Sequence, residues 1–220
     1  LLILYNNMIF GTKRITTGTH TIIIKDNGEV YYKEDRLAPT TIESLKNIVS
    51  KVCIYAHDVM FLAKDGKSVY YKNYVTDKDF YHKYDISGTA IDISMSDYSD
   101  KWILLENGNV INLKNKNQSS LSNVKSIVKD NDTTYFILKN GTIFKNNQQI
   151  KVFENVERLL IHYPYLLIIK IINGKLEFKT YTSNNNNIYS EVNDYIFDCH
   201  LTFIDCLTSS NNILLLDNNG

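Results

Sequence analysis

The chain has 220 residues, of which 44% are hydrophobic and 22% are charged, and its 24 basic side chains balance 24 acidic ones. With nine glycines and three cysteines, this composition excludes a disordered chain, a collagen-like chain and a disulfide scaffold. A net charge near zero provides no broad positive field for phosphate contacts, so we expect no nucleic-acid partner.

The N-terminal segment Leu1–Phe10 is apolar, but it is interrupted by Asn6-Asn7 and lacks the basic residues that begin a secretory signal peptide. Its two apolar parts are typical of short strands joined by a tight turn. We expect them to be equivalent to the last two strands of a repeating unit. Apolar runs elsewhere have the length of a strand, so we expect no membrane partner.

A hairpin pattern recurs along the chain. An apolar strand leads into Asn-Gly or Asp-Gly, and a second strand follows with an aliphatic residue soon after the glycine. Because these dipeptides allow positive φ at both central positions, each copy is predicted to be a β-hairpin with a type I′ turn. The five copies have the turn glycines Gly28, Gly66, Gly108, Gly141 and Gly174.

A shorter apolar strand is predicted to precede each hairpin, most clearly at Asn47-Ile48, Asn123-Val124 and Asn155-Val156. A sixth copy is predicted to begin at Val192, with Thr208–Asn212 as a degenerate turn and Ile213–Leu216 as the returning strand. The only helix-compatible segment is Thr41–Ile48, where we expect a loop or one short turn.

The turn glycines recur with the period of propellers and solenoids. A fourth strand per unit is clearest near Gln149–Phe153, and four antiparallel strands form the blade of a β-propeller. We therefore expect an all-β fold, a β-propeller of about six to seven four-stranded antiparallel blades, with residues 1–220 in a single domain and both ends in mid-blade. Either the ends complete one blade together or, as we expect, the chain is a segment of a longer polypeptide.

The first copy resembles the repeat of the regulator of chromosome condensation (RCC1) family. In that repeat a glycine and a His-Ser or His-Thr pair precede an apolar strand, an Asp-Gly or Asn-Gly turn and Val-Tyr. The matching residues are Gly18, His20-Thr21, Asn27-Gly28 and Val30-Tyr31, whereas the family's Trp-Gly and Gly-Gln-Leu-Gly segments are missing. The resemblance implies an RCC1-like propeller. It also implies guanine-nucleotide exchange on a small GTPase, although no residue here carries that activity across.

Repeated positions and cysteines offer few ligand sites. His20 and His57 occupy matching positions of successive copies, which could suggest a ligand pair, but packing of the repeats is favoured. Cys53, Cys199 and Cys206 lack zinc spacing, and Asp130-Asn131-Asp132 lacks the glycine and glutamate of a calcium loop. We therefore expect no metal, no cofactor and no catalytic residue.

The segment Tyr70–Tyr84 has the most distinctive composition, because aromatic and charged residues alternate in a long connection between strands. Protein interfaces are enriched in such residues, and the alternative is that the rings pack over the edge of a blade. The candidate protein-binding residues are Tyr71, Tyr74, Phe80, Tyr81, His82 and Tyr84.

Four functions are compatible with these patterns. The favoured one is a non-enzymatic scaffold that binds a protein partner. The alternatives are regulation of a small GTPase, an enzyme or sugar-binding propeller with a site in the central channel, and a structural part of a larger assembly, such as a viral particle. A small-molecule ligand is not expected. The odd number of cysteines favours the cytoplasm or another reducing compartment. The asparagine-rich composition is also compatible with a viral protein, for which the location would be the virion.

Overall fold

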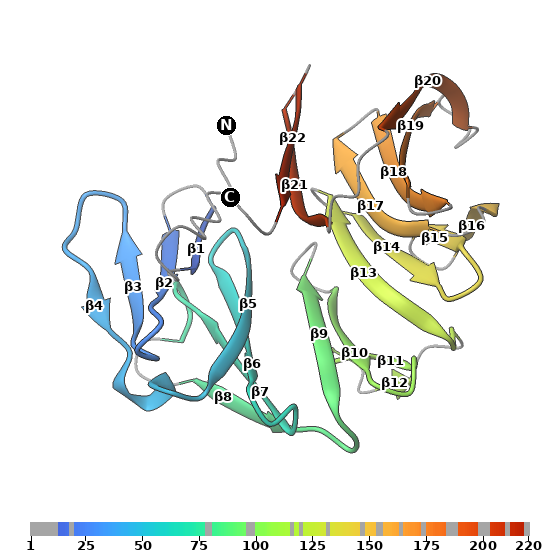
Figure 1. Ribbon diagram of the computed structural model, residues 1–220. Helices are drawn as coiled ribbons and strands as arrows, with labels where there is room; N and C mark the ends of the chain where they lie inside the picture. Colours follow the sequence, from blue (N-terminus) through green and yellow to red (C-terminus); the bar gives the residue numbers. More distant parts are fainter. Residues whose placement is uncertain are drawn as a thin grey trace. The chain divides into compact units, whose positions relative to one another are not determined.

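The computed structural model describes residues 13–17, 20–77, 81–95, 100–114, 117–118, 121–130, 133–145, 148–152, 156–162, 165–172, 175–183, 189–197, 203–209 and 212–217. These residues form 22 β-strands and one short 3-10 helix, which confirms the all-β prediction (Figure 1). The helix η2 (Glu43–Leu45) lies in the segment where the sequence predicts one short turn. The segment Leu1–Phe10 lies outside the described residues.

Each of the first five repeats is a four-stranded antiparallel sheet in which every strand pairs with the next one along the chain. The first sheet consists of β1 (Lys13–Thr17), β2 (His20–Ile24), β3 (Val30–Glu34) and β4 (Thr40–Thr41). The second consists of β5 (Val49–Tyr55), β6 (Asp58–Ala63), β7 (Ser68–Asn73) and β8 (His82–Asp85). The third consists of β9 (Ala90–Met95), β10 (Lys101–Leu105), β11 (Val110–Asn112) and β12 (Asn117–Gln118).

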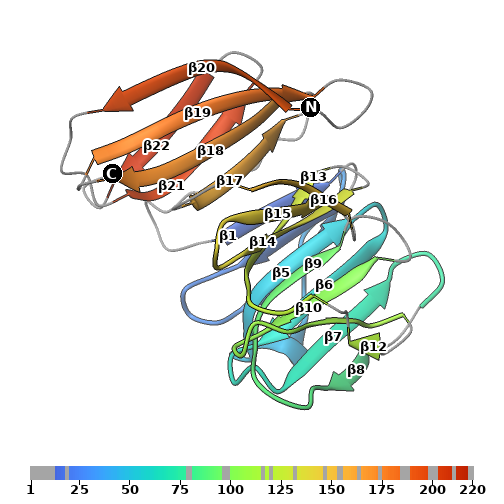
Figure 2. The same cartoon turned by 90° about the vertical axis from the view of Figure 1, so that its right-hand side faces the viewer.

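The fourth and fifth sheets repeat this order. The fourth consists of β13 (Val124–Asp130), β14 (Thr133–Leu138), β15 (Thr142–Lys145) and β16 (Gln148–Val152). The fifth consists of β17 (Val156–His162), β18 (Tyr165–Ile172), β19 (Lys175–Ser183) and β20 (Tyr189–Phe197), whose long strands run side by side in Figure 2. The last described strands, β21 (Phe203–Ser209) and β22 (Asn212–Asp217), pair with each other.

The sixth repeat begins later in the chain than the sequence predicts. Val192 lies in β20, which pairs with β19 and is the fourth strand of the fifth sheet. The residues between Ser209 and Asn212 therefore connect the first strand of the sixth repeat to its second, and they are not the turn that follows the second strand.

A β-bulge near the start of the first strand recurs from the second sheet to the sixth and supports this assignment. The first strands of the second to sixth repeats have the same register shift, in which one extra residue follows the first paired residue. Such a bulge increases the local twist of the strand. The five shifts occur at Val49/Lys51, Leu104/Leu105 (opposite Asp92 and Ala90), Val124/Ser126, Val156/Arg158 and Phe203/Asp205.

The hairpin turns are real, but the predicted type I′ geometry is wrong for the four that are described. Positive φ occurs at the turn glycine, for example 82° at Gly28 and 67° at Gly66, but not at the preceding Asn or Asp. The glycine N–H donates to the carbonyl three residues earlier, at 2.9 to 3.0 Å. This is a type I turn followed by a left-handed glycine. Asn173-Gly174 lies outside the described residues.

The Asn or Asp before each glycine has a structural role of its own. Its side-chain oxygen accepts a hydrogen bond from the backbone N–H two residues later, which is an Asx turn. The four acceptors are Asn27, Asp65, Asn107 and Asn140, with distances of 3.1, 2.8, 3.0 and 3.0 Å. These bonds explain why Asn or Asp recurs in the repeat without a type I′ turn.

Ala56, in the turn between β5 and β6, has a φ of 49°. A residue with a Cβ atom is destabilised by about 1–2 kcal/mol in this left-handed region, and glycine avoids that cost. Part of the gain is offset because glycine loses more backbone entropy on folding. We therefore expect Ala56→Gly to raise the free energy of unfolding by about 1 kcal/mol, measured by urea denaturation. Ala63→Gly, at a buried position inside strand β6, serves as the control and should lower it.

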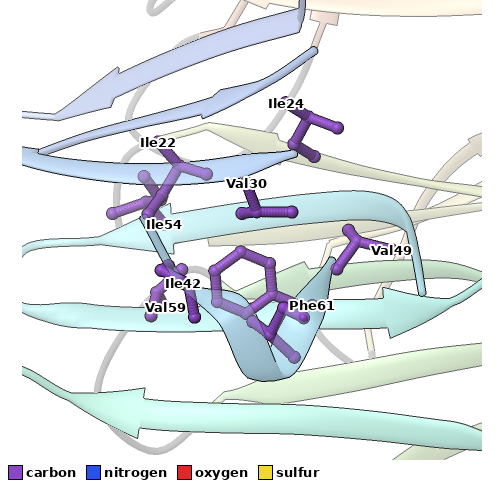
Figure 3. Packing of buried hydrophobic residues seen from close by; sticks show 9 residues of the cluster. Ile22, Ile24, Val30, Ile42, Val49, Ile54, Val59 and Phe61 are labelled. Carbon is purple, nitrogen blue, oxygen red and sulfur yellow. The ribbon is translucent and has the colours of Figure 1, made fainter. Parts of the chain in front are cut away.

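Contacts between residues divide the chain into two compact units. The first unit, residues 1–122, contains the first three sheets, and the second unit, residues 123–220, contains the remaining strands. In the first unit, one core lies between the first and second sheets (Figure 3) and another between the second and third. Strand β6 is buried on both faces, so that Val59 and Phe61 face the first sheet while Met60 and Leu62 face the third. In the second unit a core lies between the fourth and fifth sheets.

Neighbouring sheets of each unit meet along their first strands. Strand β5 contacts both β1 and β9 in the first unit, and β17 contacts both β13 and β21 in the second. An ion pair joins Lys51 Nζ on β5 to Asp92 Oδ1 on β9 at 3.0 Å. Face-to-face packing combined with adjoining first strands is how the blades of a propeller radiate from a centre. No helix in the described part of the chain is long and apolar enough to cross a membrane.

Candidate functional site

Five histidine and tyrosine side chains gather between the first two sheets, at the end where β1 leads into β2 and β3 leads into β4. We call them the His–Tyr cluster: His20 at the start of β2, Tyr32 on β3, His57 in the β5–β6 turn, and Tyr74 and Tyr81 in the β7–β8 connection. The meander order of both sheets brings these connections to one end. A backbone hydrogen bond from Tyr74 N to the His57 carbonyl, at 2.9 Å, holds the two connections of the second sheet together.

Hydrogen bonds link the cluster across the two sheets. His20 Nε2 lies 2.7 Å from His57 Nδ1, and His20 Nδ1 lies 2.7 Å from the Tyr32 hydroxyl. The hydroxyls of Tyr74 and Tyr81 are 2.9 Å apart. The rings of Tyr32 and Tyr74 are stacked, with centroids 3.8 Å apart and planes at 8°, so each sheet supplies one ring of this pair.

The cluster is electrically neutral at its centre. Burial is the main cause that lowers the pKa of His20, the neighbouring His57 lowers it further, and Glu34 opposes both. Burial, followed by the charge of Glu34, raises the pKa of Tyr32 to about 12. Burial also raises the pKa values of Tyr74 and Tyr81. His20 and the three tyrosines are therefore uncharged at neutral pH.

The structure divides the candidate binding residues between two faces of the second sheet. Tyr74 and Tyr81 pack against the core shared with the first sheet. Tyr71 lies opposite His82 in the β7–β8 pair, with ring centroids 6.3 Å apart, and Tyr84 lies opposite Val69, whose side chain belongs to the core shared with the third sheet. Phe80 lies outside the described residues.

Asp58 fixes the base of the β7–β8 connection. It is 1% exposed, and it accepts hydrogen bonds from the Tyr71 hydroxyl and, at 2.9 Å, from Asn73 Nδ2. Asn73 Oδ1 in turn accepts the backbone N–H groups of Val75 and Thr76, at 2.9 and 3.0 Å. Burial and then the bond to Asp58 raise the pKa of Tyr71. The start of the connection, residues 74–77, therefore has a defined conformation.

Two exposed apolar residues lie on corresponding connections, and the sequence analysis missed them. Leu37 is 62% exposed between β3 and β4, and Val75 is 61% exposed between β7 and β8. The only other exposed large hydrophobic residue of the described part is Ile91, at 41%. The sequence offered little signal for them, because Leu37 lies outside the Tyr70–Tyr84 segment and Val75 lies among aromatic residues within it.

Metal ligation finds little support in the described residues. His20 and His57 are a pair, and no group of three or more His, Cys, Asp or Glu side chains that could hold a metal occurs in the part of the chain that is described. Cys199 and Cys206 are among the residues for whose side chains no placement is described.

Comparison with known proteins finds relatives by structure alone. No family model matches the sequence, and no curated protein matches it. Prp20p from Saccharomyces cerevisiae, an RCC1 homologue, matches 94% of this chain over 70% of its own length, with 12% identity and a TM-score of 0.62. A streptogramin B lyase (94% and 76% covered, 10% identity, TM-score 0.57) and KlAtg21 in complex with the coiled coil of AgAtg16 (90% and 75%, 11%, 0.57) are also similar.

These matches, together with the repeated four-stranded sheets, show that the chain has a β-propeller fold and confirm the predicted fold class. The fold does not identify a function, because these structurally similar proteins include both a lyase and a protein in complex with a coiled coil.

Proposed function

We propose that the chain is a non-enzymatic RCC1-like propeller that binds another protein through the β3–β4 and β7–β8 connections of its first unit. The observation that carries the proposal is the exposure of Leu37 and Val75 on these two connections. Each is held by local hydrogen bonds, including Leu37 N to the Glu34 carbonyl at 2.7 Å and Val75 N to Asn73 Oδ1 at 2.9 Å. Apolar side chains presented on an ordered backbone lose little conformational entropy on binding.

The stacked rings of Tyr32 and Tyr74 join the first two sheets. Tyr32 lies on β3, which leads into the connection that carries Leu37, and Tyr74 directly precedes Val75 in the β7–β8 connection. Aromatic residues are enriched at the energetic centres of protein interfaces, which agrees with a binding role for this end of the unit. Among the similar structures, KlAtg21 is in complex with the coiled coil of AgAtg16.

The test is affinity capture followed by measurement of the dissociation constant for the recovered partner. We expect the double variant Leu37→Asp/Val75→Asp to weaken binding by about a hundredfold or more, since two apolar contacts are replaced by solvated charges. Ile91→Asp changes an exposed apolar residue on β9, outside both connections, and it should bind like the wild type. Equal binding by all three proteins would refute the proposed surface.

A second candidate function is regulation of a small GTPase. It is favoured by the structural similarity to Prp20p, whose binding properties to Gsp1p and histones have been described with its structure. Acceleration of nucleotide release from a GTPase by this chain would establish it. A role as a structural part of a larger assembly would instead appear as stable co-purification in a particle of defined size.

A further inference from the structure

The His20–His57 hydrogen bond connects two separate sheets. His20 is buried at the start of β2, while His57 lies in the turn between β5 and β6. The facing nitrogens, His20 Nε2 and His57 Nδ1, are 2.7 Å apart, and the ring centroids are 4.9 Å apart in an edge-on arrangement. Histidine is the side chain whose ordinary pKa lies in the pH range of acidified cell compartments.

We propose that the His20–His57 contact is an acid-sensitive latch between the first two sheets, closed when the pair is neutral or singly protonated and open when both rings are protonated. One proton placed between the two facing nitrogens makes a hydrogen bond. If both nitrogens carry a proton, two N–H groups point at each other and neither can accept. The second proton therefore removes the bond and adds repulsion between two cations.

The neighbouring groups decide how many protons the pair can hold. From β3, Glu34 lies opposite His20 in the strand register, and its carboxylate favours a first positive charge. Also from β3, the Tyr32 hydroxyl occupies the second nitrogen of His20. The carboxylate of Asp58 is next to His57 in the chain, and its Oδ1 already accepts hydrogen bonds from the Tyr71 hydroxyl and Asn73 Nδ2.

The other elements packed against the pair oppose a second charge. The β7–β8 connection contributes Tyr74 and Tyr81, whose hydroxyls bond each other. Strand β7 contributes the ammonium of Lys72, which lies 5.2 Å from the Tyr74 ring centroid and 5.1 Å from that of Tyr81. A like charge beside the cluster raises the free energy of the doubly protonated pair.

The direction of the pH dependence follows from the folded and unfolded pKa values. The folded state lowers the pKa of His20 below its ordinary value of 6.5, so below that pH the unfolded state binds protons more readily than the folded state. The stabilisation from the latch is therefore complete above pH 6.5 and is lost as the pH falls below it. Opening would separate β2 and β3 from the β5–β6 turn and expose the stacked rings of Tyr32 and Tyr74.

Hydrogen exchange at two pH values tests the latch on the full chain. We expect the protection factors of β2 and β3 amides to fall about tenfold between pH 7.5 and pH 5, while those of β18 stay within about twofold. The melting temperature should fall by about 3 °C over the same range. Unchanged protection of β2 and β3 would overturn the proposal.

Two variants separate the latch from general acid sensitivity. His57→Asn places an amide near the Nδ1 position but cannot take up a proton, so it should remove the pH dependence of β2 and β3 protection. His82→Gln removes a more exposed histidine, which lies 3.4 Å from Asp77, and it should retain the wild-type dependence. Equal pH dependence in both variants would also overturn the proposal.

A titration of the wild-type histidines decides the matter if His57→Asn does not fold. By NMR, the pKa of His20 should lie below its ordinary value, because burial and the neighbouring His57 disfavour its charged form. Independent titration of both rings near 6.5 would refute the latch. The proposal does not depend on the proposed partner, so failure to find a binding protein leaves this test intact.

Discussion

The Phe61→Ala variant should lose about 3–5 kcal/mol of unfolding free energy, the expected range for truncating a buried aromatic side chain. Phe61 is fully buried on β6 and contributes to the core between the first and second sheets. The surrounding residues come from both sheets and from η2, so the cavity cannot be closed by the movement of one element (Figure 3). The energy lost therefore includes both transfer and cavity contributions.

The measurement can be assigned to the first unit. Trp102 is the only tryptophan of the chain, and it is buried on β10 within residues 1–122. Its fluorescence should report the shifted urea midpoint of the Phe61→Ala variant. Leu37→Ala removes an apolar side chain from an exposed position and should change stability by less than about 0.5 kcal/mol. A similar loss in both variants would contradict the assigned core.

The hairpins could be predicted from the sequence because the signal is local. An apolar run that ends at Asn-Gly or Asp-Gly encodes both strands and the turn between them within ten residues, and all four described copies form hairpins. The turn type could not be predicted in the same way. The same dipeptides suit a type I′ turn and a type I turn with a left-handed glycine, and the number of residues between the paired strands decides between them.

The start of the sixth repeat was misassigned because the last two strands of the fifth sheet are longer than those of the other sheets. Strands β19 and β20 each have nine residues, so the apolar residues around Val192 extend the fifth sheet instead of opening a new one. A sequence signal could have corrected this. Asp217-Asn218-Asn219-Gly220 has the same form as Lys25-Asp26-Asn27-Gly28, which marks β22 as a second strand in the position of β2.

The candidate site was predicted in part. The alternation of side chains along a strand could have separated Tyr71 from the rings of the β7–β8 connection. The contact between Tyr32 and Tyr74 could not be found from spacing, because it depends on how the first sheet packs on the second. The matching repeat positions of His20 and His57 did indicate packing between repeats, and the structure brings the two rings together.

The turn glycines connect one sheet to the next, and the Gly66→Ala variant is expected to show it. Gly66 has a φ of 67°, and a Cβ atom at this position would lie 2.6 Å from the Ala90 carbonyl oxygen and 2.9 Å from Thr89 Cγ2. The left-handed backbone costs about 1–2 kcal/mol, and overpacking adds about 1–3 kcal/mol, so a total loss of roughly 2–5 kcal/mol is expected in urea denaturation.

Gly88→Ala provides a comparison, because it adds a Cβ atom at a positive φ without a close contact. Gly88 has a φ of 121°, but its nearest neighbour would be Leu105 Cδ1 at 3.6 Å from the new Cβ atom, which is an ordinary contact. A loss in Gly66→Ala that stays within the backbone cost of about 1–2 kcal/mol would show that the close approach of the third sheet is unimportant. The Gly66 carbonyl accepts the Ala90 N–H at 2.8 Å, and the Gly28 carbonyl accepts the Asn47 N–H at 2.8 Å. Each glycine therefore belongs to a hairpin turn and also bonds the segment that begins the next repeat. A Cβ atom at either glycine would collide with that segment, whichever turn type the hairpin adopts.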